Sequence, residues 1–161
     1  MNLVAKLLPP ANVSTDLPVS SKKRLFEQVG LLFENNHGIA RSTVYESLFA
    51  RERLGSTGLG QGVAIPHGRI KGIKDAIGAF IRLPEPVAFE APDGKPVHLV
   101  FALLVPEQAT ERHLQILSEL AQMFSDRELR EAMTSAADAG ALHKLVTEWH
   151  PDAPGQRHAT A

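Results

Sequence analysis

The chain has 161 residues, a length that suits one domain with a substantial core, and its formal net charge of −1 argues against a basic nucleic-acid-binding protein. No apolar stretch approaches the ~20 residues of a membrane span, and the start lacks the features of a signal peptide. The absence of cysteine excludes a disulfide framework and thiolate metal sites. We therefore expect a cytoplasmic protein that binds no nucleic acid and does not insert into a membrane.

The first third of the chain contains two helical patterns. Hydrophobic residues recur at helical spacing after the hydroxyl cap offered by Ser20-Ser21, and Gly38 follows them as a left-handed cap. A second helix is predicted from about residue 41 to residue 54, with Ser42 as its cap. The residues of this helix predicted to face the core are Val44, Leu48 and Phe49.

The middle of the chain is richer in strand patterns. Residues 76–83 and 97–105 are almost continuously apolar, which is typical of strands that are covered on both faces by helices. Asp93-Gly94 is a turn signal between them. The irregular stretch around this turn is marked by Pro84, Pro86, Pro92 and Pro96.

Three helices are predicted after the second strand, at about residues 110–124, 126–134 and 138–149. The apolar face of the first is formed by Leu114, Leu117, Leu120, Ala121 and Phe124. This order of elements predicts a single α/β domain, with a central mixed β-sheet and helices packed on both faces. Residues 151–161 have no apolar pattern, so we expect a flexible C-terminal tail.

A glycine-rich segment joins the helical and the strand-rich parts. Residues 55–68 read GSTGLGQGVAIPHG, and such glycines let a backbone approach a ligand and hold an anion with N–H groups. Residues 63–65 suit a short buried strand, which Pro66 should stop. His67 would then stand at the strand edge beside a flexible Gly68, an arrangement suited to carrying a phosphoryl group.

Other readings of the glycine-rich segment fit less well. A nucleotide P-loop needs Gly-Lys-Ser/Thr where this chain has Gln61-Gly62, and a dinucleotide fingerprint opens a helix, whereas these glycines lead into a strand. The chain has no G-x-S-x-G nucleophile elbow and no thiol. We expect neither a cofactor nor a bound metal.

Residues 51–68, RERLGSTGLGQGVAIPHG, resemble the phosphorylation segment of IIA components of the bacterial phosphoenolpyruvate-dependent phosphotransferase system. The resemblance is to the fructose/mannitol class and, within it, to the nitrogen-regulatory branch. Agreement continues in Ser21-Lys22-Lys23-Arg24, in the FALLVP run at 101–106 and at His113-Leu114. It extends over roughly residues 3–148, which indicates a IIA type 2 domain at residues 1–150.

The resemblance implies a role for three residues. His67 corresponds to the histidine that accepts the phosphoryl group, His113 to a second active-site histidine, and Arg51 to an arginine that pairs with phosphate. A histidine phosphocarrier protein is the implied donor. The implied targets are kinases, transporters or metabolic enzymes that are regulated by the phosphorylation state, so the chain is a carrier and regulator more than a free-standing enzyme.

The chemistry of these residues agrees with that role. A neutral imidazole is a competent nucleophile near pH 7, and the forked guanidinium of Arg51 suits phosphate. The hydroxyl and N–H groups of Ser56 and Thr57 are candidate phosphate donors. If Thr110 caps the long helix, His113 lies in the first turn, where a helix favours an anion.

Three alternatives remain open from the sequence. The chain could be a sugar-transport IIA component that passes the phosphoryl group to a separate fructose- or mannitol-type IIB partner. It could be a metal-dependent hydrolase that uses His67 and His113, or a binding module whose histidine is vestigial. The other histidines, predicted to be bystanders, are His37, His98, His143, His150 and His158.

Overall fold

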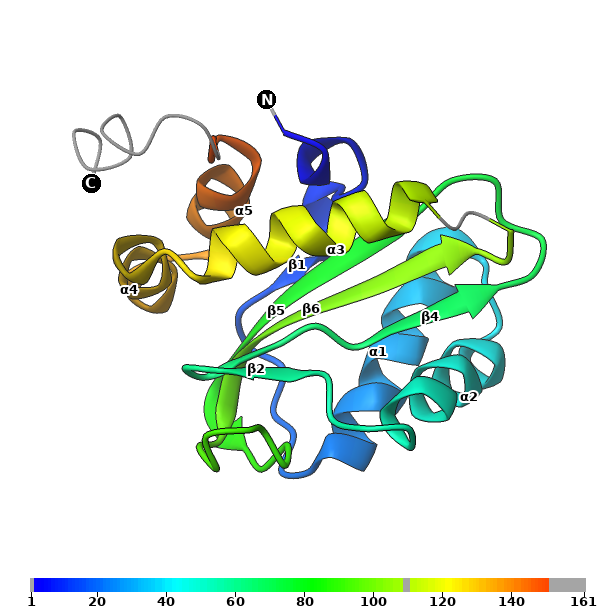
Figure 1. Cartoon of the computed structure of the whole chain (residues 1–161), viewed down its shortest axis with the longest axis horizontal. Coiled ribbons are helices and arrows are strands. Elements are labelled where there is room, and N and C mark those ends of the chain that lie inside the picture. The colour runs from blue at the N-terminus through cyan, green and yellow to red at the C-terminus, as the bar shows by residue number, and fades with distance from the viewer. Residues whose placement is uncertain (1, 109–110, 151–161) are drawn as a thin grey trace.

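A six-stranded mixed sheet lies at the centre of the structure (Figure 1), a computed structural model that describes residues 2–108 and 111–150. Strand β6 pairs antiparallel with β5 on one side and parallel with both β3 and β4 on the other. Strand β1 lies parallel to β5, and β2 lies antiparallel to β3. The strands are β1 (Val13–Ser14), β2 (Gly58–Gly60), β3 (Val63–Ala64), β4 (His67–Ile70), β5 (Ile77–Val87) and β6 (Val97–Pro106).

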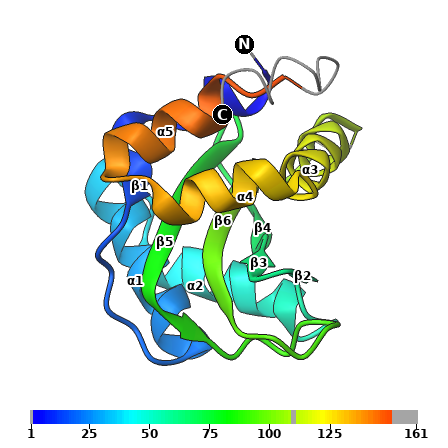
Figure 2. The same ribbon diagram turned by 90° about the vertical axis from the view of Figure 1, so that its left-hand side faces the viewer.

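Helices cover the sheet on both faces (Figures 1 and 2), which confirms the predicted α/β class. Helices α1 (Lys22–His37) and α2 (Arg41–Glu52) pack on one face. The other face carries α3 (Glu111–Phe124), α4 (Arg127–Ser135) and α5 (Ala139–Thr147), together with the short 3-10 helix η1 (Val4–Lys6). A second 3-10 helix, η2 (Pro10–Asn12), leads into β1.

Strand β6 divides the core into two layers. Leu99, Phe101 and Leu103 belong to the cluster beneath α3, α4 and α5, whereas Ala102 and Leu104 belong to the cluster over α1 and α2. All five are fully buried. The prediction that residues 97–105 form a strand covered on both faces is therefore confirmed, because a strand sends alternate side chains to opposite faces.

The first helix begins and ends as the sequence predicts. The Ser21 hydroxyl accepts from the Arg24 N–H at 3.1 Å, and Gly38 adopts the left-handed conformation with φ 71°. The cap predicted for the second helix is wrong, because Ser42 lies inside the first turn of α2. A carboxylate oxygen of Glu34 in α1 accepts from the Arg41 N–H at 3.1 Å instead.

The face of α3 that packs on the sheet differs from the predicted one. Ile116, Leu120, Met123 and Phe124 are buried. Leu114 is 61% exposed and Ala121 is also exposed. The prediction that these two residues belong to the packed apolar face of the helix is therefore wrong. The helix packs on the sheet through the side that carries Ile116, Leu120 and Met123, and Leu114 lies outside that contact.

Strand β5 continues farther than predicted and includes Pro84 and Pro86. Its pairing with β6 shifts register between Arg82 and Val87, and both prolines lie inside that irregular part. Proline lacks an N–H donor, so it is tolerated where the ladder of hydrogen bonds is already interrupted.

Candidate functional site

The predicted acceptor, His67, lies at the start of β4, beside the middle of the sheet. Val63 pairs with Leu99 and His67 pairs with Leu103, which is one common register for β3 and β4 along β6. The carbonyl of Pro66 still accepts from the Leu103 N–H at 2.9 Å. Strand β3 ends before Pro66, as predicted, and His67 is the first residue of β4, which continues along β6 in the same register.

Gly68 is a packing position and not a flexible one. It is buried in β4, and a Cβ placed on it would meet the hydroxyl of Ser47 and lie 3.0 Å from that residue's main-chain carbonyl carbon. The Ser47 hydroxyl donates to the Arg69 carbonyl at 2.9 Å. Helix α2 therefore sits directly on β4, and this contact fixes the backbone beside His67.

The hydrogen bonding of the His67 ring defines its tautomer. Nδ1 lies 2.9 Å from the carbonyl oxygen of Ile65. A carbonyl oxygen can only accept, so Nδ1 carries the proton and Nε2 carries the lone pair. Burial lowers the pKa of His67 below its usual 6.5, against the bond to Ile65, which raises it. Burial thus favours the neutral imidazole, with the lone pair on Nε2.

Arg51 and His113 both lie within electrostatic reach of His67. Charge on either residue lowers the pKa of His67 further, after the effects of burial and of Ile65. His67 pairs with Leu103, whose side chain faces the α3 layer, and His113 lies in the first turn of α3. The structure therefore brings His113 to the same side as His67, while the predicted cap, Thr110, lies outside the described residues.

Arg51 reaches this region from the last turn of α2. Its Nη1 donates to the carbonyl oxygen of Gly55 at 2.8 Å, so the guanidinium is held against the start of the glycine-rich segment. A guanidinium has five donors, and this bond occupies one of them. The remaining donors suit a phosphoryl oxygen.

Ser56 and Thr57 have structural partners in this conformation. The Ser56 hydroxyl donates to the Phe89 carbonyl at 2.7 Å, and the Thr57 hydroxyl donates to Glu52 Oε1 at 2.6 Å. The Thr57 N–H donates to the other oxygen of Glu52 at 3.1 Å. This geometry does not support the prediction that their donors face a phosphate, because both side chains tie the segment to the rest of the fold.

Two residues of the site region received no role in the sequence analysis. Glu52 is buried at the end of α2, and Lys22 at the start of α1 forms an ion pair with it at 2.9 Å. The sequence did carry a signal for Glu52, since a negative charge in the last turn of a helix opposes the helix dipole. Such a position needs a tertiary partner, and sequence alone did not identify it.

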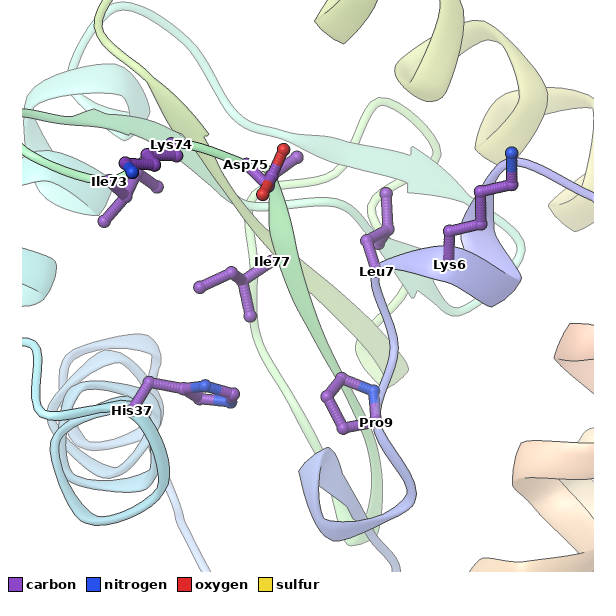
Figure 3. A pocket seen from close by; sticks show the side chains of 9 residues that line it. Lys6, Leu7, Pro9, His37, Ile73, Lys74, Asp75 and Ile77 are labelled. Carbon is purple, nitrogen blue, oxygen red and sulfur yellow. The ribbon is translucent and has the colours of Figure 1, made fainter.

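The described residues contain no group of three or more His, Cys, Asp or Glu side chains that could hold a metal ion. A cavity of about 330 Å³ opens between η1, the end of α1 and the start of β5 (Figure 3). Lys6, His37, Lys74 and Asp75 are among the residues that line it, and none of the predicted site residues does. The cavity is therefore separate from the His67 region.

No helix in residues 2–108 and 111–150 is both long enough and apolar enough to cross a membrane.

The fold and the site agree with one class of protein. Residues 6–149 match the family described as "Phosphoenolpyruvate-dependent sugar phosphotransferase system, EIIA 2", and the chain belongs to this family.

Within this class the chain is similar to nitrogen regulatory proteins. It is 43% identical over 144 residues to the "Nitrogen regulatory protein" of Pseudomonas aeruginosa, covering 89% of this chain and 94% of that protein. The crystal structure of nitrogen regulatory protein IIA-Ntr from Neisseria meningitidis is 54% identical, with a TM-score of 0.86 and coverage of 91% of this chain and all of that one. IIA mannitol from Escherichia coli, at 20% identity, TM-score 0.72 and coverage of 86% of this chain and 97% of that one, shares the fold.

Proposed function

We propose that this protein accepts a phosphoryl group on Nε2 of His67 from a histidine phosphocarrier protein and signals through its phosphorylation state. The observation that carries the proposal is the His67 Nδ1–H bond to the Ile65 carbonyl at 2.9 Å. It leaves the lone pair on Nε2, and burial favours the neutral ring that can attack phosphorus. The similarity to nitrogen regulatory proteins supports the regulatory part of the proposal.

The transfer balances without a cofactor. The P–N bond of the donor's phosphohistidine breaks as a P–N bond to His67 Nε2 forms, and the donor imidazole recovers its electron pair. The His67 ring then carries a positive charge, which the Ile65 carbonyl stabilises through Nδ1–H. In such a transfer the protein contributes mainly position and stabilisation of charge on the phosphoryl oxygens. We assign this stabilisation to Arg51.

We assign a supporting role to His113, which hydrogen-bonds the phosphoryl oxygens and is not itself the stable acceptor. Its place in the first turn of α3 supports this role, because helix N-termini favour anions. In His113→Ala, phosphoryl acceptance should be slower and the phosphorylated state shorter-lived. Acceptance and lifetime equal to those of the wild type would remove this role.

The proposal assigns phosphoryl transfer to a domain at residues 1–150, in the cytoplasm. The flexible tail predicted at residues 151–161 lies outside the described residues. The test of the proposal is acceptance from phosphoenolpyruvate through the general enzyme and the phosphocarrier protein, with the phosphocarrier omitted as the control. Acceptance that requires the phosphocarrier supports the proposed donor. Equal acceptance without it would contradict that donor.

One observation favours a second function, in which the phosphoryl group passes on to a separate IIB partner. The "PTS system fructose-specific EIIA component" of Haloferax volcanii is 30% identical over 146 residues, covering 90% of this chain and 95% of that protein. Incubation of the phosphorylated chain with fructose- and mannitol-type IIB domains separates the two functions. Rapid transfer to either domain would favour transport, and retention of the phosphoryl group would favour regulation.

A further inference from the structure

Glu52 is a buried carboxylate at the last residue of α2, and only 3% of its side chain is exposed. Its two oxygens accept from the Thr57 hydroxyl at 2.6 Å, the Thr57 N–H at 3.1 Å and Lys22 Nζ at 2.9 Å. A buried carboxylate is costly unless it is paired and hydrogen-bonded, and three donors meet that need here. The helix dipole opposes a negative charge at this end, so helix formation does not account for the residue.

Hydrogen bonds connect Glu52 to the His67 ring in three steps. Thr57 donates twice to Glu52, and the carbonyl of Thr57 accepts from the Ile65 N–H at 3.0 Å. The carbonyl of Ile65 accepts from His67 Nδ1 at 2.9 Å. Because Glu52 holds the side chain and the N–H of Thr57, and the Thr57 carbonyl holds the Ile65 N–H, the Glu52 carboxylate contributes to the position of Ile65, together with the pairing of β3 and Pro66 with β6.

A second connection runs from the same turn to Arg51. The main-chain carbonyl of Glu52 accepts from the Gly55 N–H at 3.1 Å, and the Gly55 carbonyl accepts from Arg51 Nη1 at 2.8 Å. Glu52 therefore binds the turn at two points: its main-chain carbonyl accepts from the Gly55 N–H, and its carboxylate accepts from the Thr57 N–H. The guanidinium that we assign to the phosphoryl group is oriented by the same turn that fixes Thr57.

Lys22 balances the charge of Glu52. Its ammonium group also lies 3.3 Å from Glu90 and 4.5 Å above the centre of the Phe89 ring, and its side chain is only 15% exposed. This pairing offsets a negative charge that would otherwise oppose the arrival of a phosphoryl group nearby. It also ties the start of α1 to the turn that carries the connections above.

We propose that Glu52 is a positioning residue for phosphoryl acceptance, whose carboxylate holds the His67 ring in its Nδ1–H tautomer through Thr57 and Ile65. The inference rests on the proposed function of His67. Glu52 acts through its neighbours and does not itself contact the phosphoryl group. Glu119, a half-buried carboxylate of α3, accepts from the Val4 N–H at 3.0 Å, a bond to a different part of the chain from the Glu52–Thr57–Ile65 connection.

The test compares Glu52→Gln with Glu119→Gln, the same change at a half-buried carboxylate that accepts from a main-chain N–H on the opposite face of the sheet. Two quantities are measured: the initial rate of phosphoryl acceptance by intact mass, and the tautomer and titration of His67 by ¹H–¹⁵N NMR. We expect Glu52→Gln to slow acceptance by up to about 100-fold and to shift the His67 ring towards a mixture of tautomers. Glu119→Gln should change neither quantity.

A second pair of variants keeps the test decisive if Glu52→Gln does not fold. Thr57→Val removes the hydroxyl bond to Glu52, whereas Thr57→Ser retains a hydroxyl and should restore the wild-type rate and His67 signals. Wild-type acceptance and unchanged His67 signals in Glu52→Gln, or in Thr57→Val where that variant replaces it, would overturn the inference. Slower acceptance with unchanged His67 signals would overturn it too, because Glu52 would then act by another route.

The NMR measurement also separates this inference from the proposed function. A wild-type chain that accepts no phosphoryl group from a competent donor would overturn the proposed function. A change of the His67 tautomer in Glu52→Gln would still support the physical connection between the two residues.

Discussion

The imidazole Nδ1 of His67 donates to the carbonyl oxygen of Ile65, two residues earlier on the same extended segment, at 2.9 Å. The bond spans Pro66, which has no N–H donor of its own. Nδ1 is therefore occupied by a main-chain hydrogen bond, and the lone pair of Nε2 can react with phosphorus.

This bond predicts which nitrogen is phosphorylated. The phosphoryl group should be found on Nε2, because reaction at Nδ1 would require the Ile65 bond to break. The ¹⁵N and ³¹P NMR spectra of phosphorylated protein with labelled histidine distinguish the two isomers. A spectrum with the phosphoryl group on Nδ1 would contradict the assignment.

The free energy of unfolding should depend on pH through His67 and His98. Burial lowers the pKa of both residues, and for His98 the charge of Arg82 lowers it further. The unfolded chain, with histidine pKa values near ~6.5, binds more protons than the folded one around that pH. The stabilisation is therefore complete above about pH 6.5 and is lost as the pH falls from there through the folded pKa values.

Urea unfolding at pH 7.5 and pH 5.5 measures this effect. We expect lower stability at pH 5.5, and a smaller difference between the two pH values in His67→Gln. The lowered pKa values of the Glu34 and Asp93 carboxyls do not interfere, because their contribution to stability is lost only as the pH falls below their ordinary values of 4.5 and 3.8. Stability that rises towards pH 5.5 would contradict the prediction.

Arg51 should contribute to phosphoryl acceptance through its charge and its forked geometry. Arg51→Gln is expected to slow acceptance by about 100-fold, in line with the loss of one donor that stabilises developing charge. Arg53 is exposed at the end of the same helix and serves as the control. Equal rates in Arg51→Gln and Arg53→Gln, measured by intact mass over time, would remove Arg51 from the site.

Gly68 should be required for the packing of α2 on β4. Gly68→Ala forces a Cβ into the main chain of Ser47 and should lower the free energy of unfolding by about 1–3 kcal/mol. Gly140→Ala is the matched control, since its Cβ would lie 3.5 Å from the nearest atom, in helix α5. That variant should gain up to about 1 kcal/mol from helix propensity. A Gly68→Ala protein as stable as the wild type in urea would show that the helix can move away.

The sequence predicted the parts of the fold that local physics determines. The apolar run of β6 indicated burial on both faces, and Ser21 and Gly38 marked the ends of α1 through their own conformational preferences. The short strands β1 and β2 were not predicted, because two or three residues carry too little periodicity.

The features that depend on tertiary contacts were predicted less well. The exposure of Leu114 follows from how α3 meets the sheet, which its helical spacing does not specify. Glu52 and Thr57 are five residues apart, and their bonds form only because the chain turns back after α2. The three residues with an assigned role, His67, His113 and Arg51, were all proposed from the sequence, whereas the hydrogen bonds that position His67 and Arg51 required the structure.

The most direct test of the account compares the intact mass of the wild type and His67→Ala after incubation with phosphoenolpyruvate, the general enzyme and the phosphocarrier protein. The account predicts one added phosphoryl group on the wild type, which is lost in acid as expected for phosphohistidine, and no added mass on His67→Ala. A wild type that gains no mass with a competent donor, or a His67→Ala protein that gains the same mass, would contradict it.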